Sequence, residues 1–280
     1  MNVTLPDNKL YKKAKLVYAS IIGICILSII LVIYAQFFEG RTVTTIGNLK
    51  GKSEVGYEVL KSEFNDLFTN SLQKYDEKYQ SKKSDVTKDL VYTGYIKKEN
   101  QDGDYNLDVN IPYINIKNST IEKYNQEIQD VFENKAEDIL KTKNKQSIYT
   151  VEYSSYIQDG ILSIAIQANL KEGSNAQRII VKTYNYNLDE NKEVSLEELL
   201  QKENVEKTYA QSKIDDEIKT QQKYAEDLKA LGHPIYERDI NDKKYKIENV
   251  TEFYFHDGSI YIIFAYGNDK YTSELDIAII

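Results

Sequence analysis

The sequence predicts an α+β fold in which antiparallel sheets pack against helices, organised as two subdomains that follow one transmembrane helix. Three observations lead to this fold class. Residues 16–38 form a run without charge in a chain that is otherwise rich in Lys, Asp and Glu. Stretches of strand-forming residues occur in pairs around Asp-Gly steps, as in antiparallel hairpins. The helical stretches are grouped rather than strictly alternating with strands, which favours α+β.

The uncharged run at 16–38 is 23 residues long and holds fourteen Ile, Leu, Val or Phe residues. A helix of this length spans about 34 Å, enough for a hydrocarbon core of about 30 Å. Positive residues stay in the cytosol, and four lysines precede the run: Lys9, Lys12, Lys13 and Lys15. A cleaved signal peptide is the alternative, but its apolar region is usually only about 7–15 residues long.

Five segments follow from this reading of the chain. Residues 1–15 are expected to be a cytoplasmic tail, 16–38 the transmembrane helix, and 39–52 a stalk with three glycines. Residues 53–145 and 146–280 are expected to form an N-terminal and a C-terminal α+β subdomain outside the cell. The only cysteine lies inside the apolar run, so the outer part must be stable without a disulfide.

The charge of the outer part excludes one class of function. The chain carries a formal net charge of −8, and without the four lysines and one aspartate of residues 1–15 the remainder carries −11. A nucleic-acid-binding protein would need a basic face, and the sequence has none. The acidity suits attraction of a cationic partner, although many domains are acidic only to stay soluble.

The N-terminal subdomain is expected to contain a helix, a strand pair and a second helix. Apolar residues at three- and four-residue steps predict an amphipathic helix: Val55, Val59, Leu60, Phe64, Leu67, Phe68, Leu72 and Tyr75. Strands are expected at 90–97 and from 105 to 111, joined by a turn at Asp102-Gly103. Ser119 and Glu122 match a capping box at the start of the second helix. One face of this helix is expected to be apolar: Ile121, Tyr124, Ile128, Val131, Phe132, Ala136, Ile139 and Leu140.

The C-terminal subdomain is expected to be mainly strands. Asp159-Gly160 and Asp257-Gly258 predict tight hairpin turns, and Ser195 predicts a helix cap. The expected strands are 149–157, 161–170, 179–188, 251–255, 260–266 and 272–280. A short helix is expected at 195–200, and a longer one at 205–231 that ends before Gly232 and Pro234.

Several of these stretches resemble a known family. LSIAIQANLKEGSNAQRIIVKTYNYNLDENKEVSLEELL (162–200) resembles the extracytoplasmic module of RsiV-type anti-sigma factors and PdaC peptidoglycan deacetylases. Its motif pieces are Tyr184-Asn185-Tyr186-Asn187-Leu188-Asp189 and Ser195-Leu196-Glu197-Glu198-Leu199. FYFHDGSIYIIFAYG (253–267) is similar to the family's later hairpin, and NLDVNIPYINIKNSTIEKYNQEI (106–128) to its companion subdomain. The resemblance covers about residues 90–280.

The sequence also departs from that family. Where many members have a Gly-Gly-Ala-His loop, this chain has Gly173-Ser174-Asn175-Ala176. The chain stops at Ile280, where the module itself ends, and its tail of about 15 residues is short for holding a sigma factor. The resemblance therefore implies the membrane-anchored outer module, without the catalytic deacetylase domain.

No pattern in the sequence identifies a catalytic, cofactor-binding or metal-binding residue. His233 and His256 are the only histidines, and no nucleophile motif accompanies them; zinc binding by both is a weaker alternative. Alternating side chains resemble calcium ligands: Asn100, Asp102, Asp104, Asn106 and Asp108. With Gly103 at position 6 of a calcium loop, however, Val109 occupies position 12, where a Glu is required. The adjacent pairs Asp215-Asp216 and Glu197-Glu198 do not face each other on a helix. The chain is therefore not expected to be an enzyme.

The remaining candidate feature is tyrosine, which occurs 24 times in a chain without Trp. A sugar- or protein-binding aromatic face is one reading, and filling of half-buried sheet surfaces is the favoured one. The tyrosines on predicted strands are Tyr92, Tyr95, Tyr153, Tyr156, Tyr184, Tyr186, Tyr254, Tyr261 and Tyr266.

The expected function is a single-pass, membrane-anchored binding or sensing protein of the bacterial cell envelope, with the bulk of the chain extracellular. The family resemblance implies a lysozyme-like cationic protein or a cell-wall component, such as peptidoglycan, as the ligand. The alternatives are an accessory or degenerate peptidoglycan-modifying protein and a purely structural envelope protein. The binding residues, the oligomeric state and any link to a sigma factor do not follow from the sequence.

Overall fold

The computed structural model describes residues 64–280, apart from residues 75, 102–103, 143–145, 234 and 267–273. The predicted tail, membrane run and stalk lie outside the described residues, as does the predicted turn at Asp102-Gly103. Within the described residues, no helix has both the length and the apolar character needed to span a bilayer. Ser53–Ile280 forms one compact unit.

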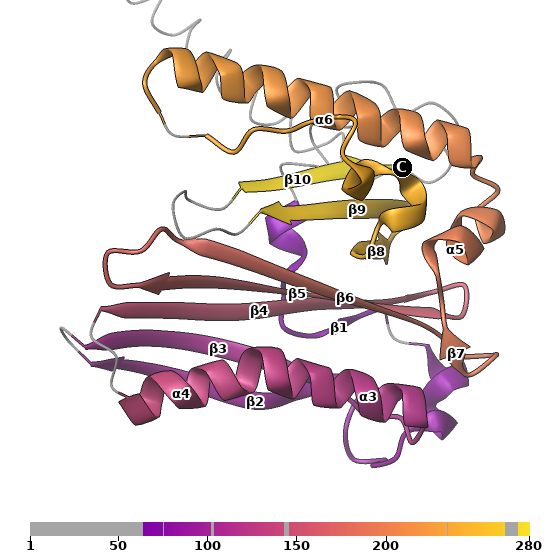
Figure 1. Cartoon of the computed structure of the whole chain (residues 1–280). Coiled ribbons are helices and arrows are strands. Elements are labelled where there is room, and N and C mark those ends of the chain that lie inside the picture. The colour runs from indigo at the N-terminus through magenta and orange to yellow at the C-terminus, as the bar shows by residue number, and fades with distance from the viewer. Residues whose placement is uncertain (1–63, 75, 102–103, 143–145, 234, 267–273) are drawn as a thin grey trace, which may run out of the picture. The chain divides into compact units, whose positions relative to one another are not determined.

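A seven-stranded sheet is the larger of two sheets in this unit (Figure 1). Its strands are β1 (Leu72–Gln73), β2 (Val91–Gln101), β3 (Tyr105–Ile114), β4 (Ser147–Gln158), β5 (Ile161–Glu172), β6 (Arg178–Asn187) and β7 (Lys192–Glu193). The order is β2-β3-β4-β5-β6-β7, with β1 beside the later half of β4. The β3–β4 and β1–β4 pairs are parallel. The predicted α+β class is confirmed and most strand pairs are antiparallel, as expected. The large sheet is nevertheless mixed, because a helical crossover returns the chain to β4 in the direction of β3.

Helices cover one face of this sheet. They are α3 (Ser119–Ile128), a π-helical turn η3 (Gln129–Glu133) and α4 (Asn134–Thr142). Their apolar stripe is buried as predicted: Ile121, Tyr124, Ile128, Phe132, Ala136 and Ile139. The cap is Asn118 rather than the predicted Ser119, because the Asn118 side chain accepts a 2.8 Å hydrogen bond from the Thr120 amide.

A three-stranded antiparallel sheet packs on the other face. It consists of β8 (Phe253–His256), β9 (Ser259–Tyr266) and β10 (Glu274–Ile279). One side of this small sheet contacts the large sheet through Tyr254, Tyr261 and Ile263. Its opposite side packs against α5 (Leu196–Lys202) and α6 (Lys207–Ala230). Figure 1 shows the resulting layers, with α6 over the small sheet and α3 and α4 beneath the large one.

The local signals for the hairpin turns and for one helix cap are confirmed. Asp159 and Gly160 have φ of 49° and 78°, and Asp257 and Gly258 have φ of 46° and 72°. These positive values are what a tight two-residue turn requires. At α5 the amide of Glu198 donates to Ser195 Oγ, and Glu198 Oε2 accepts from the Ser195 amide, which completes a capping box.

The predicted amphipathic helix at 55–75 is wrong in its described part. The chain there forms a short 3₁₀ helix, η1 (Phe64–Leu67), followed by β1. Asn70 and Lys74 have φ of 55° and 59°, which no α-helix contains. The Asn70 amide donates to the Tyr153 carbonyl, and Asn70 Oδ1 accepts from the Tyr153 amide, both at 2.9 Å. Pairing with β4 therefore overrides the helical periodicity.

The remaining described helices are short 3₁₀ segments, η2 (Glu77–Lys82), η4 (Lys243–Tyr245) and η5 (Ile247–Asn249). The predicted subdomain boundary at residue 146 falls between α4 and β4. The large sheet takes β2 and β3 from one side of this boundary and β4 to β7 from the other.

The two sheets are joined by buried polar side chains, which we call the inter-sheet seam: Ser154, Ser163, Thr183 and Asn185. Asn185 Nδ2 donates to the Phe253 carbonyl at 2.8 Å, and Ser163 Oγ accepts from the Phe255 amide at 2.9 Å. Thr183 Oγ1 accepts from the Phe253 amide at 3.0 Å. Ser154 shares a 2.7 Å hydrogen bond with the Tyr254 hydroxyl. These contacts satisfy the edge of β8, which would otherwise be buried without partners.

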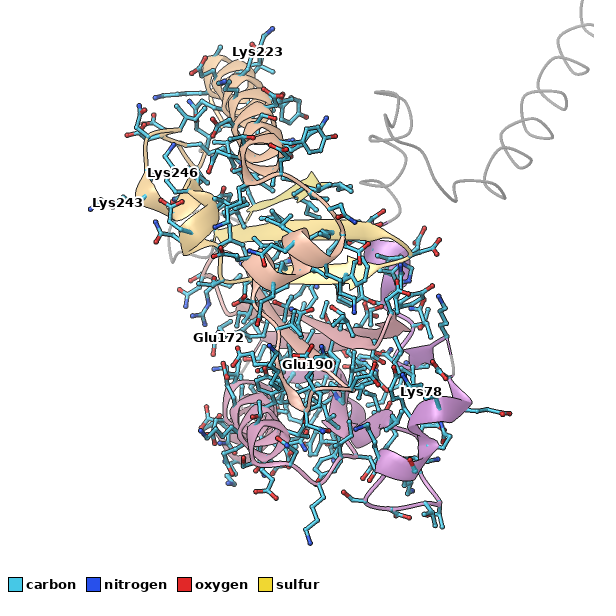
Figure 2. All side chains as sticks on the ribbon, turned by 90° about the vertical axis from the view of Figure 1, so that its right-hand side faces the viewer. Lys78, Glu172, Glu190, Lys223, Lys243 and Lys246 are labelled. Carbon is cyan, nitrogen blue, oxygen red and sulfur yellow. The ribbon has the colours of Figure 1, made fainter. Side chains whose placement is uncertain are left out.

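A buried ion pair holds the irregular chain between α6 and β8. Arg238 and Asp276 are 5% and 1% exposed, and two hydrogen bonds of 2.6 and 2.9 Å join them. Arg238 also pairs with Glu274, and the Tyr266 hydroxyl donates to Asp276 Oδ2 at 2.8 Å. The neighbouring Lys243, in contrast, projects away from this segment (Figure 2). The Arg238–Asp276 ion pair thus holds the chain around residue 238 against β10.

Replacing Asn185 by Ala tests the inter-sheet seam. The change removes the partner of the Phe253 carbonyl and of Ser163, and leaves buried polar groups unpaired, so we expect a loss of about 1–3 kcal/mol of unfolding free energy. Urea unfolding of the full chain, followed by the near-ultraviolet circular dichroism of its tyrosines, measures the loss. Asn169→Ala is the control, because Asn169 is only half-buried and makes a 3.5 Å contact with Thr150. Equal losses in the two variants would contradict the role given to the seam.

Candidate functional site

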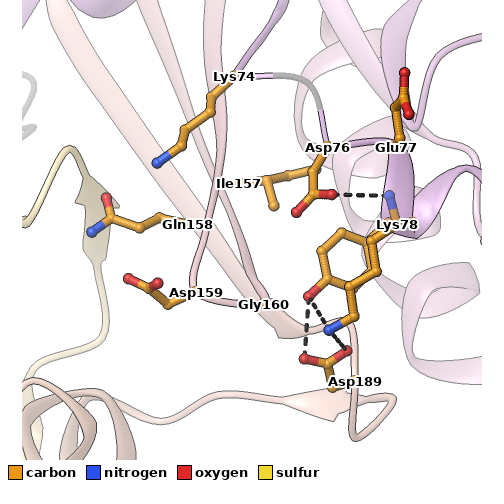
Figure 3. Close-up of a pocket in the computed structure, with 10 residues that line it drawn as sticks. Lys74, Asp76, Glu77, Lys78, Ile157, Gln158, Asp159, Gly160 and Asp189 are labelled. Carbon is orange, nitrogen blue, oxygen red and sulfur yellow. Dashed lines mark hydrogen bonds and ion pairs between the residues drawn. The ribbon is translucent and has the colours of Figure 1, made fainter.

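A cavity that we call the Lys74 pocket lies where the chain after β1 meets the β4–β5 turn. Its volume is about 430 Å³, within the range of small-ligand sites. Figure 3 shows its residues, which come from three distant parts of the sequence. They are Lys74, Asp76, Glu77, Lys78, Tyr79, Ile157, Gln158, Asp159, Gly160 and Asp189.

One side of the Lys74 pocket is a closed hydrogen-bonded cluster. The Tyr79 hydroxyl donates to Asp189 Oδ2 at 3.1 Å, and Lys78 Nζ lies 3.1 Å from that hydroxyl and 2.8 Å from Asp189 Oδ1. The hydrogen bond from Lys78 lowers the pKa of Asp189, and the hydrogen bond to Asp189 raises the pKa of Lys78. Both groups are therefore charged at neutral pH, and they form an ion pair with each other.

Gly160 allows this cluster to form. A Cβ at residue 160 would lie 2.7 Å from Asp189 Oδ2 and 3.1 Å from the Tyr79 hydroxyl. Its φ of 78° is also strained for any residue with a side chain. The turn therefore needs glycine for its backbone conformation and for the close approach of Asp189.

On the opposite side of the pocket, the charged side chains of Lys74 and Asp159 have no hydrogen-bond or ion-pair partner among the described residues. Both residues have positive φ, and Lys74 Nζ lies 5.5 Å from the centre of the Tyr156 ring. Asp76 caps η2 by accepting from the Lys78 amide at 2.9 Å. An ammonium and carboxylates around one opening suit a ligand that carries charges of both signs.

The two histidines do not join this pocket. His256 lies against the rings of Tyr156 and Tyr254, at centroid distances of 4.2 and 5.7 Å, and its Nε2 is 3.1 Å from Gln73 Oε1. Burial lowers its pKa. His233 is exposed after the end of α6. In the described ranges, no three His, Cys, Asp or Glu side chains are placed to hold a metal ion.

The other sequence candidates fall outside a site as well. Asp102 lies outside the described residues, and Asp108 pairs with Lys98 across the β2–β3 hairpin at 2.8 Å. Of the nine tyrosines on predicted strands, all but Tyr92 and Tyr95 are buried, so these residues mainly fill the core. The favoured interpretation of the tyrosines therefore agrees with the structure.

Sequence reasoning missed the Lys74 pocket itself. Its charged residues lie just after β1, at or next to η2, and in the turns near Asp159 and Asp189, and no spacing links them along the chain. The Asp159-Gly160 turn was the only part with a sequence signal. Positive φ at a lysine has no signature that a single sequence can reveal.

Comparisons with known proteins show a distant structural likeness. No protein-family model and no curated protein matches the chain. Its structure is similar to the crystal structure of a DUF3298 family protein from Pseudomonas aeruginosa PAO1, with 10% sequence identity and a TM-score of 0.39. The match covers 64% of this chain and 83% of that one.

Gly160→Ala tests the close approach in the Lys74 pocket. The variant has both a strained backbone and a 2.7 Å clash, so we expect it to lose about 1–3 kcal/mol of unfolding free energy. Gly258→Ala is the matched control. It sits in the second Asp-Gly turn with φ of 72°, and its Cβ would meet only Gln158 Nε2 at 4.0 Å. Urea unfolding should show the larger loss for residue 160, and an equal loss would show that Asp189 moves freely.

The depressed pKa of His256 predicts a dependence of stability on pH. Because burial lowers its pKa in the folded state, the unfolded chain binds more protons below the ordinary value of 6.5. The stability contributed by neutral His256 is therefore present above pH 6.5 and is lost as the pH falls. Urea unfolding between pH 7.5 and 5.5 should show a smaller loss in His256→Gln than in the wild type. Parallel pH profiles would contradict this assignment.

Proposed function

We propose that this chain is a membrane-anchored binding or sensing protein that acts outside the cytoplasmic membrane of a bacterial cell. Its N-terminus is in the cytosol, residues 16–38 cross the membrane, and Ser53–Ile280 faces the exterior. The chain acts by binding rather than by catalysis, and its ligand is a protein or a component of the cell wall.

The Lys74 pocket is the observation that carries the binding role. Lys74 and Asp159 form no contacts with described residues that would neutralise them, and both are held in a backbone conformation with positive φ. At Asp159 this conformation belongs to the β4–β5 turn. At Lys74 it is backbone strain, which persists only where the surrounding structure imposes it and is common at ligand sites. A peptide stem of the cell wall or a protein surface offers the matching pair of ammonium and carboxylate groups.

The location rests on the sequence. An uncharged run of 23 residues preceded by four lysines supports a retained anchor with the positive end inside. The net charge of −11 after residue 15 supports attraction of a cationic protein. The resemblance of residues 90–280 to the RsiV and PdaC modules supports lysozyme-like proteins and peptidoglycan as the ligands to test first.

A double variant of the pocket tests the proposal. Lys74→Met with Asp159→Asn removes both uncommitted charges and leaves the net charge unchanged, so long-range attraction is retained. We expect the purified full chain to bind lysozyme or peptidoglycan sacculi, and the double variant to bind about tenfold more weakly because direct contacts are lost. Lys98→Met with Asp108→Asn, which removes an exposed pair on β2 and β3, should bind like the wild type.

Two results would contradict this function. Retention of neither lysozyme nor sacculi by the wild-type chain would remove the binding role, and release of acetate from peptidoglycan would make the chain an enzyme. The proposed topology is tested by a separate experiment. Protease added to intact protoplasts should digest a tag placed after Ile280. A protected tag would overturn the proposed topology and leave the binding result intact.

A further inference from the structure

A second described cavity lies between α3, β6, β7 and the start of β8, and we call it the Tyr184 cavity. Its volume is about 200 Å³, below the range of about 300–1,000 Å³ that holds a drug-sized ligand. The cavity is therefore too small for a drug-sized ligand, but it is large enough for one side chain. Its ionisable residues are Tyr124, Glu127, Lys182, Tyr184, Glu193 and Glu252.

The cavity has an excess of negative charge. Three carboxylates, from Glu127, Glu193 and Glu252, are opposed by one ammonium. Lys182 Nζ lies 3.4 Å from Glu127 and 3.6 Å from Glu252, beyond the usual hydrogen-bond range. Glu252 is held in place, since its Oε2 accepts from the amide of Thr183 at 2.7 Å and from the Thr183 hydroxyl at 3.0 Å. A preformed anionic group therefore faces the cavity.

The buried hydroxyl of Tyr184 is an independent indication that the cavity binds a ligand. Tyr184 lines the cavity, is only 5% exposed, and its hydroxyl has no hydrogen-bond partner among the described residues. An unpaired buried hydroxyl costs free energy, so few remain in native proteins. Burial and then the Glu127 and Glu252 carboxylates raise the pKa of Tyr184. Both carboxylates line the cavity, as does Tyr184 itself.

We propose that the Tyr184 cavity receives the side chain of a lysine or arginine presented by a partner protein, with the Tyr184 hydroxyl and the Glu127 and Glu252 carboxylates around its cationic group. An N–H donor satisfies the unpaired hydroxyl oxygen, and the cation offsets the excess negative charge. The cavity volume selects a single side chain over a larger ligand. This inference rests on the proposed binding function and names the chemistry of the partner.

Two pairs of matched variants isolate the cavity. Tyr184→Phe and Tyr186→Phe each remove one buried, unpaired hydroxyl from β6, and only Tyr184 lines the cavity. Neither variant loses a hydrogen bond to a described residue, so both should fold. Glu127→Gln and Glu122→Gln each remove one negative charge from α3, and only Glu127 lines the cavity.

The measurement is the affinity of the full chain for a fluorescent decalysine peptide, with spermine as a small cation for comparison. We expect Tyr184→Phe and Glu127→Gln to weaken decalysine binding by about three- to tenfold, as for the loss of one hydrogen bond to a charged group. Tyr186→Phe and Glu122→Gln should bind like the wild type. Equal affinities within each pair would overturn the inference, and an effect on spermine alone would overturn its assignment to a protein side chain.

The outcome is separable from that of the proposed function. If the wild type binds lysozyme or sacculi while the Tyr184 and Tyr186 variants bind decalysine equally, the cavity assignment fails and the binding function stands. If decalysine binding depends on Tyr184 while lysozyme and sacculi are both ignored, the cavity assignment stands and the ligands proposed above are wrong.

Discussion

The constraint on which the rest of this fold depends is the burial of the β8 edge against the large sheet. A sheet edge carries unpaired amides and carbonyls, and burying it in an apolar core would leave them without partners. Here Ser163, Thr183 and Asn185 on the face of the large sheet provide those partners. Because these contacts need defined positions, they also fix the register in which the small sheet packs. The position of the small sheet therefore depends on these three polar side chains together with the apolar contacts of Tyr254, Tyr261 and Ile263.

The same seam positions the Tyr184 cavity. Glu252 directly precedes β8, and its carboxylate accepts from the amide and hydroxyl of Thr183. That carboxylate therefore provides a partner for the Thr183 amide on β6 and is also part of the cavity lining. On the other face of β6, Tyr184 points toward α3, where Tyr124 packs on its ring at 4.9 Å. The packing between the two sheets thus places the Glu252 carboxylate in the lining of a cavity that Tyr184 also lines.

Local features of this fold were predictable because they depend on neighbouring residues. The turns at Asp159-Gly160 and Asp257-Gly258, the cap at Ser195 and the buried stripe of α3 each follow from a few adjacent side chains. The parallel β3–β4 pair was not predictable from such patterns, since it depends on where a long crossover returns. The helix expected at 55–75 failed in its described part for a related reason. Asn70 hydrogen-bonds to the backbone of Tyr153, and this distant pairing outweighs a helical apolar pattern.

The cavities could not be predicted from the sequence for the same physical reason. Glu127 and Glu252 come from α3 and from the chain before β8, so only the tertiary fold brings them together. Net charge, in contrast, is visible in the composition, and it governs how fast an oppositely charged partner arrives. A neutral hydroxyl such as that of Tyr184 adds nothing to long-range attraction. Its contact forms only after docking, so it acts on how long a complex lasts rather than on how often one forms. In the proposed binding role, acidity would attract many cations, whereas the Tyr184 hydroxyl and the Glu252 carboxylate would distinguish among them.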